Sequence, residues 1–276
     1  MQTQRERAAH FRGLHSRPPL VLPNAWDAAS ARVIERAGAT AIATTSAGVA
    51  WTYGRRDGEQ LTRDDMLEVV ARITRTVNVP VTADVEGGYG TGSIRDVDQT
   101  VRRVVEVGAV GINLEDSPGK DGAGLLAADA HAERIRAARE GARAAGGDIV
   151  INARTDVYLY EIGAPETRFD ETVARARHYL AAGADCLFVP GVRDAATISA
   201  LVRAIAAPIN ILAGPGAPTI AELRELGVAR VSLGPRLVEA ALAATQVAAR
   251  EVLQSGTYAS LAGNLSFSEI QGLFPG

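Results

Sequence analysis

The chain has 276 residues, of which 47% are hydrophobic and 22% are charged, and its formal net charge is −3. A chain of this length can bury a large core in one α/β barrel, and its nearly balanced charge argues against a nucleic-acid partner. The single cysteine, Cys186, excludes an internal disulfide and a metal site built from cysteines.

The N-terminal sequence lacks the apolar segment of a secretory signal. No apolar run approaches the roughly 20 residues that a membrane-spanning helix needs. We therefore expect no membrane partner and a cytoplasmic location.

A helix-like segment, at about residues 3–15, precedes a regular alternation of strands and helices. Each predicted strand is short, rich in Val and Ile, and apolar on both faces, as expected of a parallel strand that is covered on both sides. These strands are residues 19–24, 40–46, 79–85, 110–116, 148–156, 184–191, 208–214 and 229–234. Glycines that suit a left-handed C′ position end four of the helices between them: Gly38, Gly108, Gly183 and Gly227. Eight such units predict a closed (β/α)8 barrel of the TIM type, with a doubly wound open sheet as the alternative.

A helical tail follows the predicted eighth helix, which spans about residues 236–254. We expect one domain over residues 1–276, with the barrel at about 19–255 and the tail at about 256–276. The apolar side chains of the tail could pack on their own barrel. Exchange of the tail between subunits is favoured, because a closed barrel needs no further core.

The chemistry of such barrels lies at the carboxyl ends of the strands. The third strand ends in Asp84 and Glu86, the fourth in Glu115 and the fifth in Arg154. Three carboxylates without a neighbouring His or Cys suit a hard cation such as Mg²⁺ or Mn²⁺, and an arginine fork suits a substrate carboxylate. The alternative interpretation is that these acids cap helices or pair with basic residues.

Several motifs at these strand ends occur together in a fixed order. They are PNAWDAASARVIERAG, TTSAGVAW, RRDGE, ADVEGGYG, GINLEDS and INARTDVYL. In this order the chain resembles the isocitrate lyase/phosphoenolpyruvate mutase superfamily from about residue 19 to about residue 235. The resemblance implies an α/β barrel with Mg²⁺ and swapped C-terminal helices, usually a homotetramer built as a dimer of dimers. It also implies substrates that are 2-oxo acids, or 2-hydroxy acids that are cleaved to them.

The resemblance assigns roles to individual residues. It implies that three acids serve the metal: Asp84, Glu86 and Glu115. It implies that the substrate is bound by Arg154, by the loop aspartate Asp57, and by the backbone amides of a small-residue turn, Thr45, Ser46 and Ala47. Asn210 is a weaker match to a polar substrate contact.

One segment departs from the family pattern. Lyases of the family carry a cysteine-containing motif after the Glu-Asp dipeptide, whereas residues 117–124 read SPGKDGAG. Cleavage of isocitrate or methylisocitrate by the usual route is therefore not expected. The mutase pattern calls for a lysine and an asparagine here; Lys120 could be the lysine, but no asparagine follows nearby.

The remaining parts suffice for enolate chemistry on a small 2-oxo or 2-hydroxy acid. We expect a Mg²⁺-dependent carbon–carbon lyase or decarboxylase, with Arg154 holding the substrate and Asp57 or Tyr158 as the candidate base. Three alternatives stay open: phosphonopyruvate mutase-like chemistry, a phosphosugar enzyme that binds phosphate near Gly214 and Gly234, and a carboxylate-binding barrel without turnover.

Overall fold

The computed structural model describes residues 2–16, 19–118 and 124–274. Its α-helices are α1 (Gln4–Leu14), α2 (Ala28–Arg36), α3 (Ser46–Thr52), α4 (Arg63–Thr76), α5 (Ile94–Glu106), α6 (Ala128–Ala144), α7 (Arg168–Ala181), α8 (Ala195–Ala204), α9 (Ile220–Glu225), α10 (Arg236–Ser255) and α11 (Phe267–Gln271). Two short 3₁₀ helices are η1 (Pro165–Thr167) and η2 (Ala259–Leu261). The four glycines expected to end helices all have positive φ angles, as predicted.

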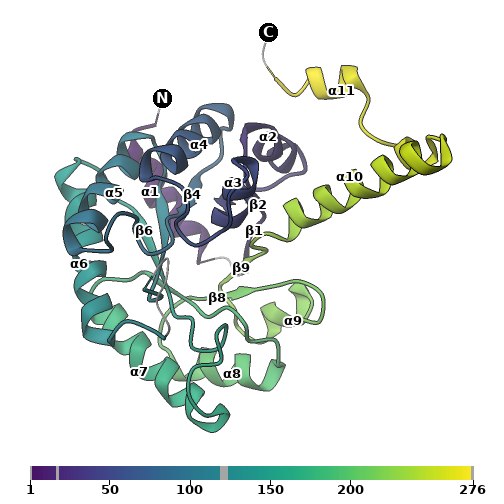
Figure 1. Cartoon of the computed structure of the whole chain (residues 1–276). Helices are drawn as coiled ribbons and strands as arrows, with labels where there is room; N and C mark the ends of the chain where they lie inside the picture. The colour runs from purple at the N-terminus through teal and green to yellow at the C-terminus, as the bar shows by residue number, and fades with distance from the viewer. Residues whose placement is uncertain (1, 17–18, 119–123, 275–276) are drawn as a thin grey trace.

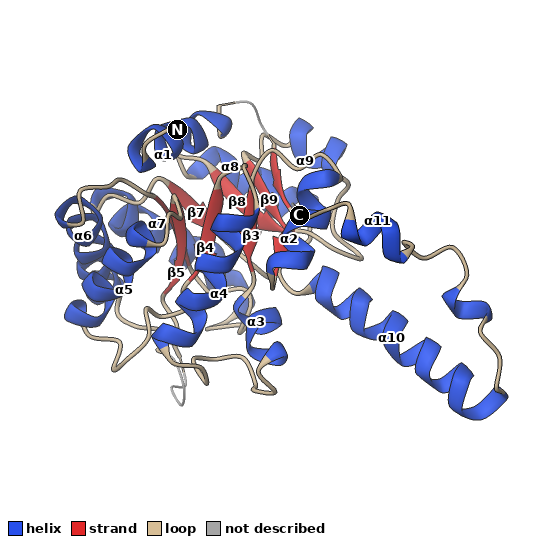
Figure 2. Ribbon diagram, turned by 90° about the horizontal axis from the view of Figure 1, so that it is seen from above, coloured by secondary structure: helices blue, strands red, loops and turns tan. Residues whose placement is uncertain are grey.

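Parallel strands form the centre of the molecule, and helices surround them (Figures 1 and 2). The strands are β1 (Leu20–Leu22), β2 (Asn24–Ala25), β3 (Ile42–Thr44), β4 (Val81–Asp84), β5 (Gly111–Glu115), β6 (Val150–Arg154), β7 (Cys186–Phe188), β8 (Ile209–Leu212) and β9 (Arg230–Ser232). Their order in the sheet is β1-β9-β8-β7-β6-β5-β4-β3-β2.

The first predicted strand divides into β1 and β2 at Pro23, which has no backbone N–H to donate to a neighbouring strand. β1 pairs with β9, whereas β2 pairs with β3. One short stretch of chain therefore joins both edges of the sheet, and the predicted TIM-type barrel is confirmed.

The predicted N-terminal helix is present as α1. It begins with a capping box, in which Thr3 accepts a hydrogen bond from the Glu6 backbone while the Glu6 side chain accepts one from Thr3. Phe11 of α1 is fully buried with Leu22 and Val150, which belong to β1 and β6. The helix thus packs under the amino ends of the strands, and the opposite end of the barrel stays available for the site.

The C-terminal segment leaves the barrel as a long arm. Helix α10 projects away from the strands, and only Val238 among its residues is buried (Figure 1). A left-handed Gly256 ends α10, after which the chain turns back to α11. None of the helices in the described residues combines the length and apolar character needed to cross a membrane.

Candidate active site

Charged residues end three neighbouring strands. Asp84 is the last residue of β4, Glu115 the last of β5 and Arg154 the last of β6. The strands lie side by side in parallel register, with Asp84 opposite Asn113 and Glu115 opposite Arg154. The structure therefore brings these residues together at the carboxyl end of the barrel, where the sequence placed them.

Arg154 is held between two carboxylates. Its Nη1 lies 2.7 Å from Glu115 Oε2, and its Nε donates to Asp156 Oδ1 at 2.6 Å. Its guanidinium also lies 5.8 Å from the centre of the Phe188 ring. Burial alone would lower the pKa of Arg154, but Glu115 and Asp156 raise that pKa well above its ordinary value. The side chain is therefore a fixed cation.

Glu86 is engaged by the loop that carries Asp57. The Glu59 backbone N–H donates to Glu86 Oε2 at 2.6 Å, and the Tyr89 hydroxyl donates to Glu86 Oε1 at 3.0 Å. Glu59 in turn accepts a hydrogen bond from the Tyr89 backbone at 2.7 Å. Glu59, Glu86 and Tyr89 all have left-handed backbones, with φ of 55°, 49° and 62°. Such strain is costly in non-glycine residues and is concentrated at functional sites.

The acids of this region act on one another. Burial, followed by the charges of Asp57 and Asp84, raises the pKa of Glu86 to about 8. Burial and Asp84 also raise the pKa of Asp57, and a hydrogen bond from Ser46 partly opposes them. Asp57 is exposed as a residue, but its carboxyl group is near enough to Asp84 and Arg154 to respond to both. Asp57, Asp84 and Glu86 thus form one negatively charged cluster.

Asp84 has an oxygen that no described residue satisfies. Its Oδ2 accepts from the Ser46 backbone at 3.2 Å, and its own backbone N–H donates to Thr44 Oγ1 at 2.9 Å. Its Oδ1 is buried and has no hydrogen-bond partner among the described residues. A buried, unpaired carboxylate oxygen is costly, and a hard cation is the partner that it suits best.

The metal set predicted from sequence is not assembled as a cage. Among the described residues, no group of three His, Cys, Asp or Glu side chains is placed so that it could hold a metal ion. Glu115 is paired with Arg154, and Glu86 is bonded to Glu59 and Tyr89. Mg²⁺ commonly keeps several waters and needs only one or two carboxylates. The residues therefore fit a hydrated cation at Asp84 better than a closed site of three carboxylates.

The small-residue segment after β3 is the start of a helix rather than a turn. Thr45 precedes α3, which begins at Ser46 and includes Ala47, and all three residues are buried. The Ser46 amide, expected to contact substrate, is bonded to Asp84. The segment is nevertheless adjacent to the carboxylates, as the sequence predicted.

The other predicted site residues have different surroundings. Asn210 is fully buried and exchanges hydrogen bonds with Ser232 at 3.2–3.3 Å. Tyr158 is half-buried, and burial raises its pKa while Arg168, a cation outside the cluster, lowers it. Tyr160 was not singled out from sequence, yet its pKa responds to Asp156 and Glu115 after burial. Lys120 lies outside the described residues.

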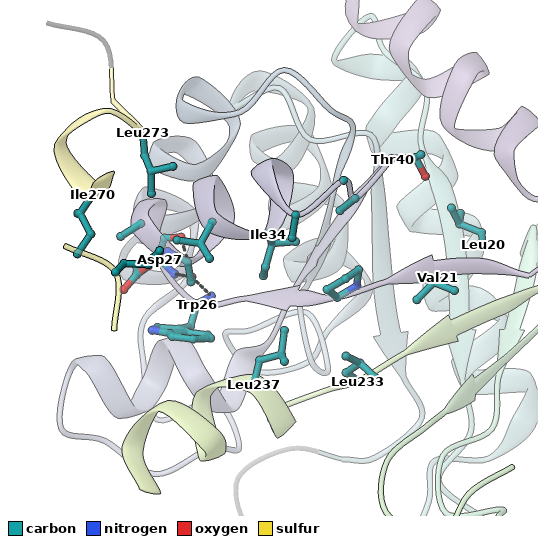
Figure 3. Close-up of a pocket in the computed structure, with 18 of the residues that line it drawn as sticks. Leu20, Val21, Trp26, Asp27, Ile34, Thr40, Leu233, Leu237, Ile270 and Leu273 are labelled. Carbon is teal, nitrogen blue, oxygen red and sulfur yellow. Dashed lines mark hydrogen bonds between the residues drawn. The ribbon is translucent and has the colours of Figure 1, made fainter. Parts of the chain in front are cut away.

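A large apolar cavity lies elsewhere, beside β1 and α2 (Figure 3). It has a volume of about 1050 Å³, and Ile270 and Leu273 of the C-terminal segment line it together with Leu20, Ile34 and Leu237. Its walls are too apolar to bind a small carboxylate. The charged strand ends therefore remain the candidate site.

Comparison with known proteins agrees with this geometry. The family model described as phosphoenolpyruvate phosphomutase matches residues 11–253. The chain belongs to this family, and through it to the isocitrate lyase/phosphoenolpyruvate mutase superfamily. The resemblance stated from sequence is thereby confirmed.

Family members with several activities are similar to this chain. An uncharacterized protein of Mycobacterium tuberculosis is 38% identical over 86% of each chain. The 2-methylisocitrate lyase of Aeropyrum pernix is 30% identical over 88% of this chain and 79% of its own. A solved Burkholderia cenocepacia structure, described only as a lyase/mutase, is 40% identical, with a TM-score of 0.90 over 98% of this chain and 95% of its own. Other matches carry the names oxaloacetate decarboxylase and oxaloacetate acetylhydrolase, the latter solved with its product oxalate.

Proposed function

We propose that this phosphomutase-family protein is a divalent-metal-dependent enzyme that breaks a carbon–carbon bond in a small 2-oxo or 2-hydroxy acid. Decarboxylation of an oxaloacetate-like acid and cleavage of a substituted malate both fit. The ion is Mg²⁺, with Mn²⁺ as the alternative. The relatives named as lyases and decarboxylases support this reaction class.

The unsatisfied Asp84 oxygen is the observation that carries the proposal. It lies near Asp57 and Glu86, whose pKa values are raised by burial and by the charge of Asp84, and on the strand beside Glu115, which pairs with Arg154. Like charges buried together are costly unless a cation joins them. A bound divalent cation would supply Lewis-acid stabilisation of the negative charge that develops as the bond breaks.

Residues of the chain bind the substrate and transfer the proton. Arg154 binds the substrate carboxylate, since its guanidinium is charged and its Nη2 makes no hydrogen bond to a described residue. Asp57 is the candidate base or acid, because its pKa is raised toward neutrality and its carboxyl group responds to Asp84. Tyr160 is a second candidate proton donor, as burial and then the charges of Asp156 and Glu115 raise its pKa.

The sequence of the segment after Asp116 favours decarboxylation over a cleavage reaction in which a cysteine is the general acid. The sequence there has neither Cys nor His, and Cys186 is buried inside β7. Burial raises the pKa of Cys186 to about 12, so its thiol is neutral at ordinary pH. Decarboxylation needs no protein base to begin, and a water or Tyr can protonate the product.

Turnover with defined substrates tests the proposal. Oxaloacetate, 2,3-dimethylmalate, methylisocitrate and phosphonopyruvate are each assayed with Mg²⁺ and with EDTA, for the wild type and for Glu115→Gln. We expect EDTA-sensitive cleavage of one of the first two substrates, which is lost in the variant. Turnover of phosphonopyruvate alone would favour the mutase reaction. Binding of oxalate without turnover of any substrate would favour a non-catalytic barrel.

A further inference from the structure

A buried chain of polar contacts lies behind Arg154 and leads away from the proposed substrate. It runs from Arg175 and Tyr179 of α7, through Asp116 after β5, to Asp156 after β6. Asp116, Asp156 and Tyr179 are fully buried, and Arg175 is 8% exposed. None of them was assigned a role from sequence.

Asp156 uses both of its carboxylate oxygens. Oδ1 accepts from Arg154 Nε at 2.6 Å, and Oδ2 accepts a hydrogen bond from the Ser117 hydroxyl. The Asp156 backbone N–H donates to Asp116 Oδ1 at 3.0 Å. A carboxylate with no solvent exposure is tolerated only when it is paired and hydrogen-bonded in this way. Its position is therefore determined on three sides.

Asp116 is fixed from the other direction. The Tyr179 hydroxyl donates to Asp116 Oδ2 at 2.7 Å, and Arg175 Nη1 donates to the same oxygen at 3.2 Å. Arg175 Nη1 also donates to the Leu126 carbonyl at 2.8 Å, while the Leu126 backbone donates to the Asp116 carbonyl at 2.9 Å. Helix α7 is thus connected by hydrogen bonds to the strand end that carries Asp156.

These contacts leave part of Arg154 unused. Asp156 engages Nε and Glu115 engages Nη1, and no hydrogen bond to Nη2 occurs among the described residues. A guanidinium is planar, so contacts at two of its nitrogens fix the direction in which the third points. Holding a binding group in place before the substrate arrives reduces the entropy lost on binding.

We propose that Asp156 is the positioning residue for Arg154, and that Asp116, held by Arg175 and Tyr179, fixes Asp156. Glu115 alone leaves the guanidinium free to turn about its Nη1 contact, whereas the added contact at Nε sets its plane. This inference rests on the proposed function in one respect, namely that Arg154 binds the carboxylate of the substrate.

Two substitutions at Asp156 and one control test the proposal. Asp156→Ala removes both acceptors, whereas Asp156→Asn keeps the shape and one acceptor for Arg154 Nε. Asp148→Ala is the control, because Asp148, like Asp156, pairs with arginine: with Arg12 at 2.7 Å and with Arg139 at 3.2 Å. It precedes β6 and so lies at the opposite end of the barrel.

Oxalate binding in the presence of Mg²⁺ is measured by calorimetry, together with the melting temperature. We expect Asp156→Ala to weaken oxalate binding about 100-fold, since a small misplacement of a positioned group has that cost. Asp156→Asn should recover binding to within about tenfold of the wild type, because only the charge assistance is lost. Asp148→Ala should lower the melting temperature and leave oxalate affinity unchanged. Wild-type oxalate affinity in Asp156→Ala would overturn the proposal.

Crystal structures of the ligand-free wild type and Asp156→Ala separate this proposal from the proposed function. We expect the Arg154 guanidinium of the variant to turn about its Nη1 contact with Glu115, out of the plane that it has in the wild type. An unchanged Arg154 would overturn the positioning role whatever the wild type binds. A displaced Arg154 in a protein whose wild type binds no carboxylate would support positioning and contradict the function.

Discussion

In the acidic cluster of Asp57, Asp84 and Glu86, one carboxylate oxygen is buried without a hydrogen-bond partner among the described residues. This oxygen is Oδ1 of Asp84. The other Asp84 oxygen is held by the Ser46 amide, so the side chain cannot turn away without losing that bond. By contrast, both carboxylate oxygens of Glu86 accept hydrogen bonds from the protein, and Oε2 of Glu115 is paired with Arg154. The three acids that the sequence groups together therefore have unequal roles.

Asp84→Asn should have opposite effects on metal binding and on stability. We expect the affinity for Mg²⁺ to fall by about 100-fold or more, because a charged ligand is lost. Substitution of residues that only contact a metal ligand already lowers metal affinity by about 10- to 100-fold. The metal-free variant should unfold at higher temperature than the wild type, since repulsion between Asp84 and Asp57 is relieved. Calorimetry and thermal melts in EDTA measure the two effects. Asp129→Asn, whose side chain is 87% exposed, is the control; equal Mg²⁺ affinity in Asp84→Asn would refute the assignment.

Glu86 should make the metal-free protein less stable as the pH rises. Its pKa is raised from 4.5 to about 8 in the folded protein, so the folded state holds the proton more tightly than the unfolded state. The free energy of unfolding must then decrease between these two values, by at most about 1.4 kcal/mol per pH unit. Glu86→Gln is neutral throughout and should flatten this slope. Urea denaturation in EDTA across the range measures it, and parallel slopes for the two proteins would contradict the prediction.

The sequence predicted where the residues at the strand ends lie, but it did not predict the contacts that the neighbouring loops make. Asp84, Glu115 and Arg154 were predictable because parallel strands end at the same edge of a barrel. The contacts of Glu86 with Glu59 and Tyr89 depend on left-handed backbone conformations in two separate loops. The residue pattern does not predict these conformations, because the residues are not glycines. The motifs RRDGE and ADVEGGYG contained these residues but not their conformations.

At the scale of elements, helix α1 and strand β5 meet under the barrel. Gly111 begins β5, and a Cβ atom there would lie 2.8 Å from Thr82 Oγ1, 3.0 Å from Phe11 Cε1 and 3.0 Å from the Val150 carbonyl oxygen. A glycine at this position lets the α1 side chain approach the strand closely. The eight-strand pattern was readable from sequence, but this close approach was not.

Gly111→Ala should therefore destabilise the barrel by about 1–3 kcal/mol, the usual cost of overpacking a core. Gly13→Ala in α1 is the matched control, because nothing lies within 4 Å of a Cβ atom there. We expect that control to be neutral or to stabilise by up to about 1 kcal/mol, through helix propensity. Urea denaturation gives both values. A Gly111→Ala protein as stable as the control would show that α1 does not pack as described.

At the scale of the whole molecule, α10 is the feature that the barrel does not explain. The helix exposes Leu242 and Leu253, which are 52% and 83% accessible. They lie about three helical turns apart and so share one face. Leu265 and Ile270 of the following segment border the apolar cavity beside α2. Apolar surface on a projecting arm is typical of a region that another protein chain covers.

The sequence predicts that the tail, at about residues 256–276, is exchanged between subunits of a homo-oligomer, and the exposed apolar side chains of α10 extend this prediction to the whole arm. We expect the wild type to have a mass of several chains by light scattering, and Leu242→Glu/Leu253→Glu to have a lower mass, because burying two carboxylates opposes association. Ala144→Glu/Ala196→Glu adds the same charge at exposed positions of α6 and α8 and should keep the wild-type mass. A monomeric wild type, or a double Leu variant of unchanged mass, would mean that the arm packs only on its own barrel.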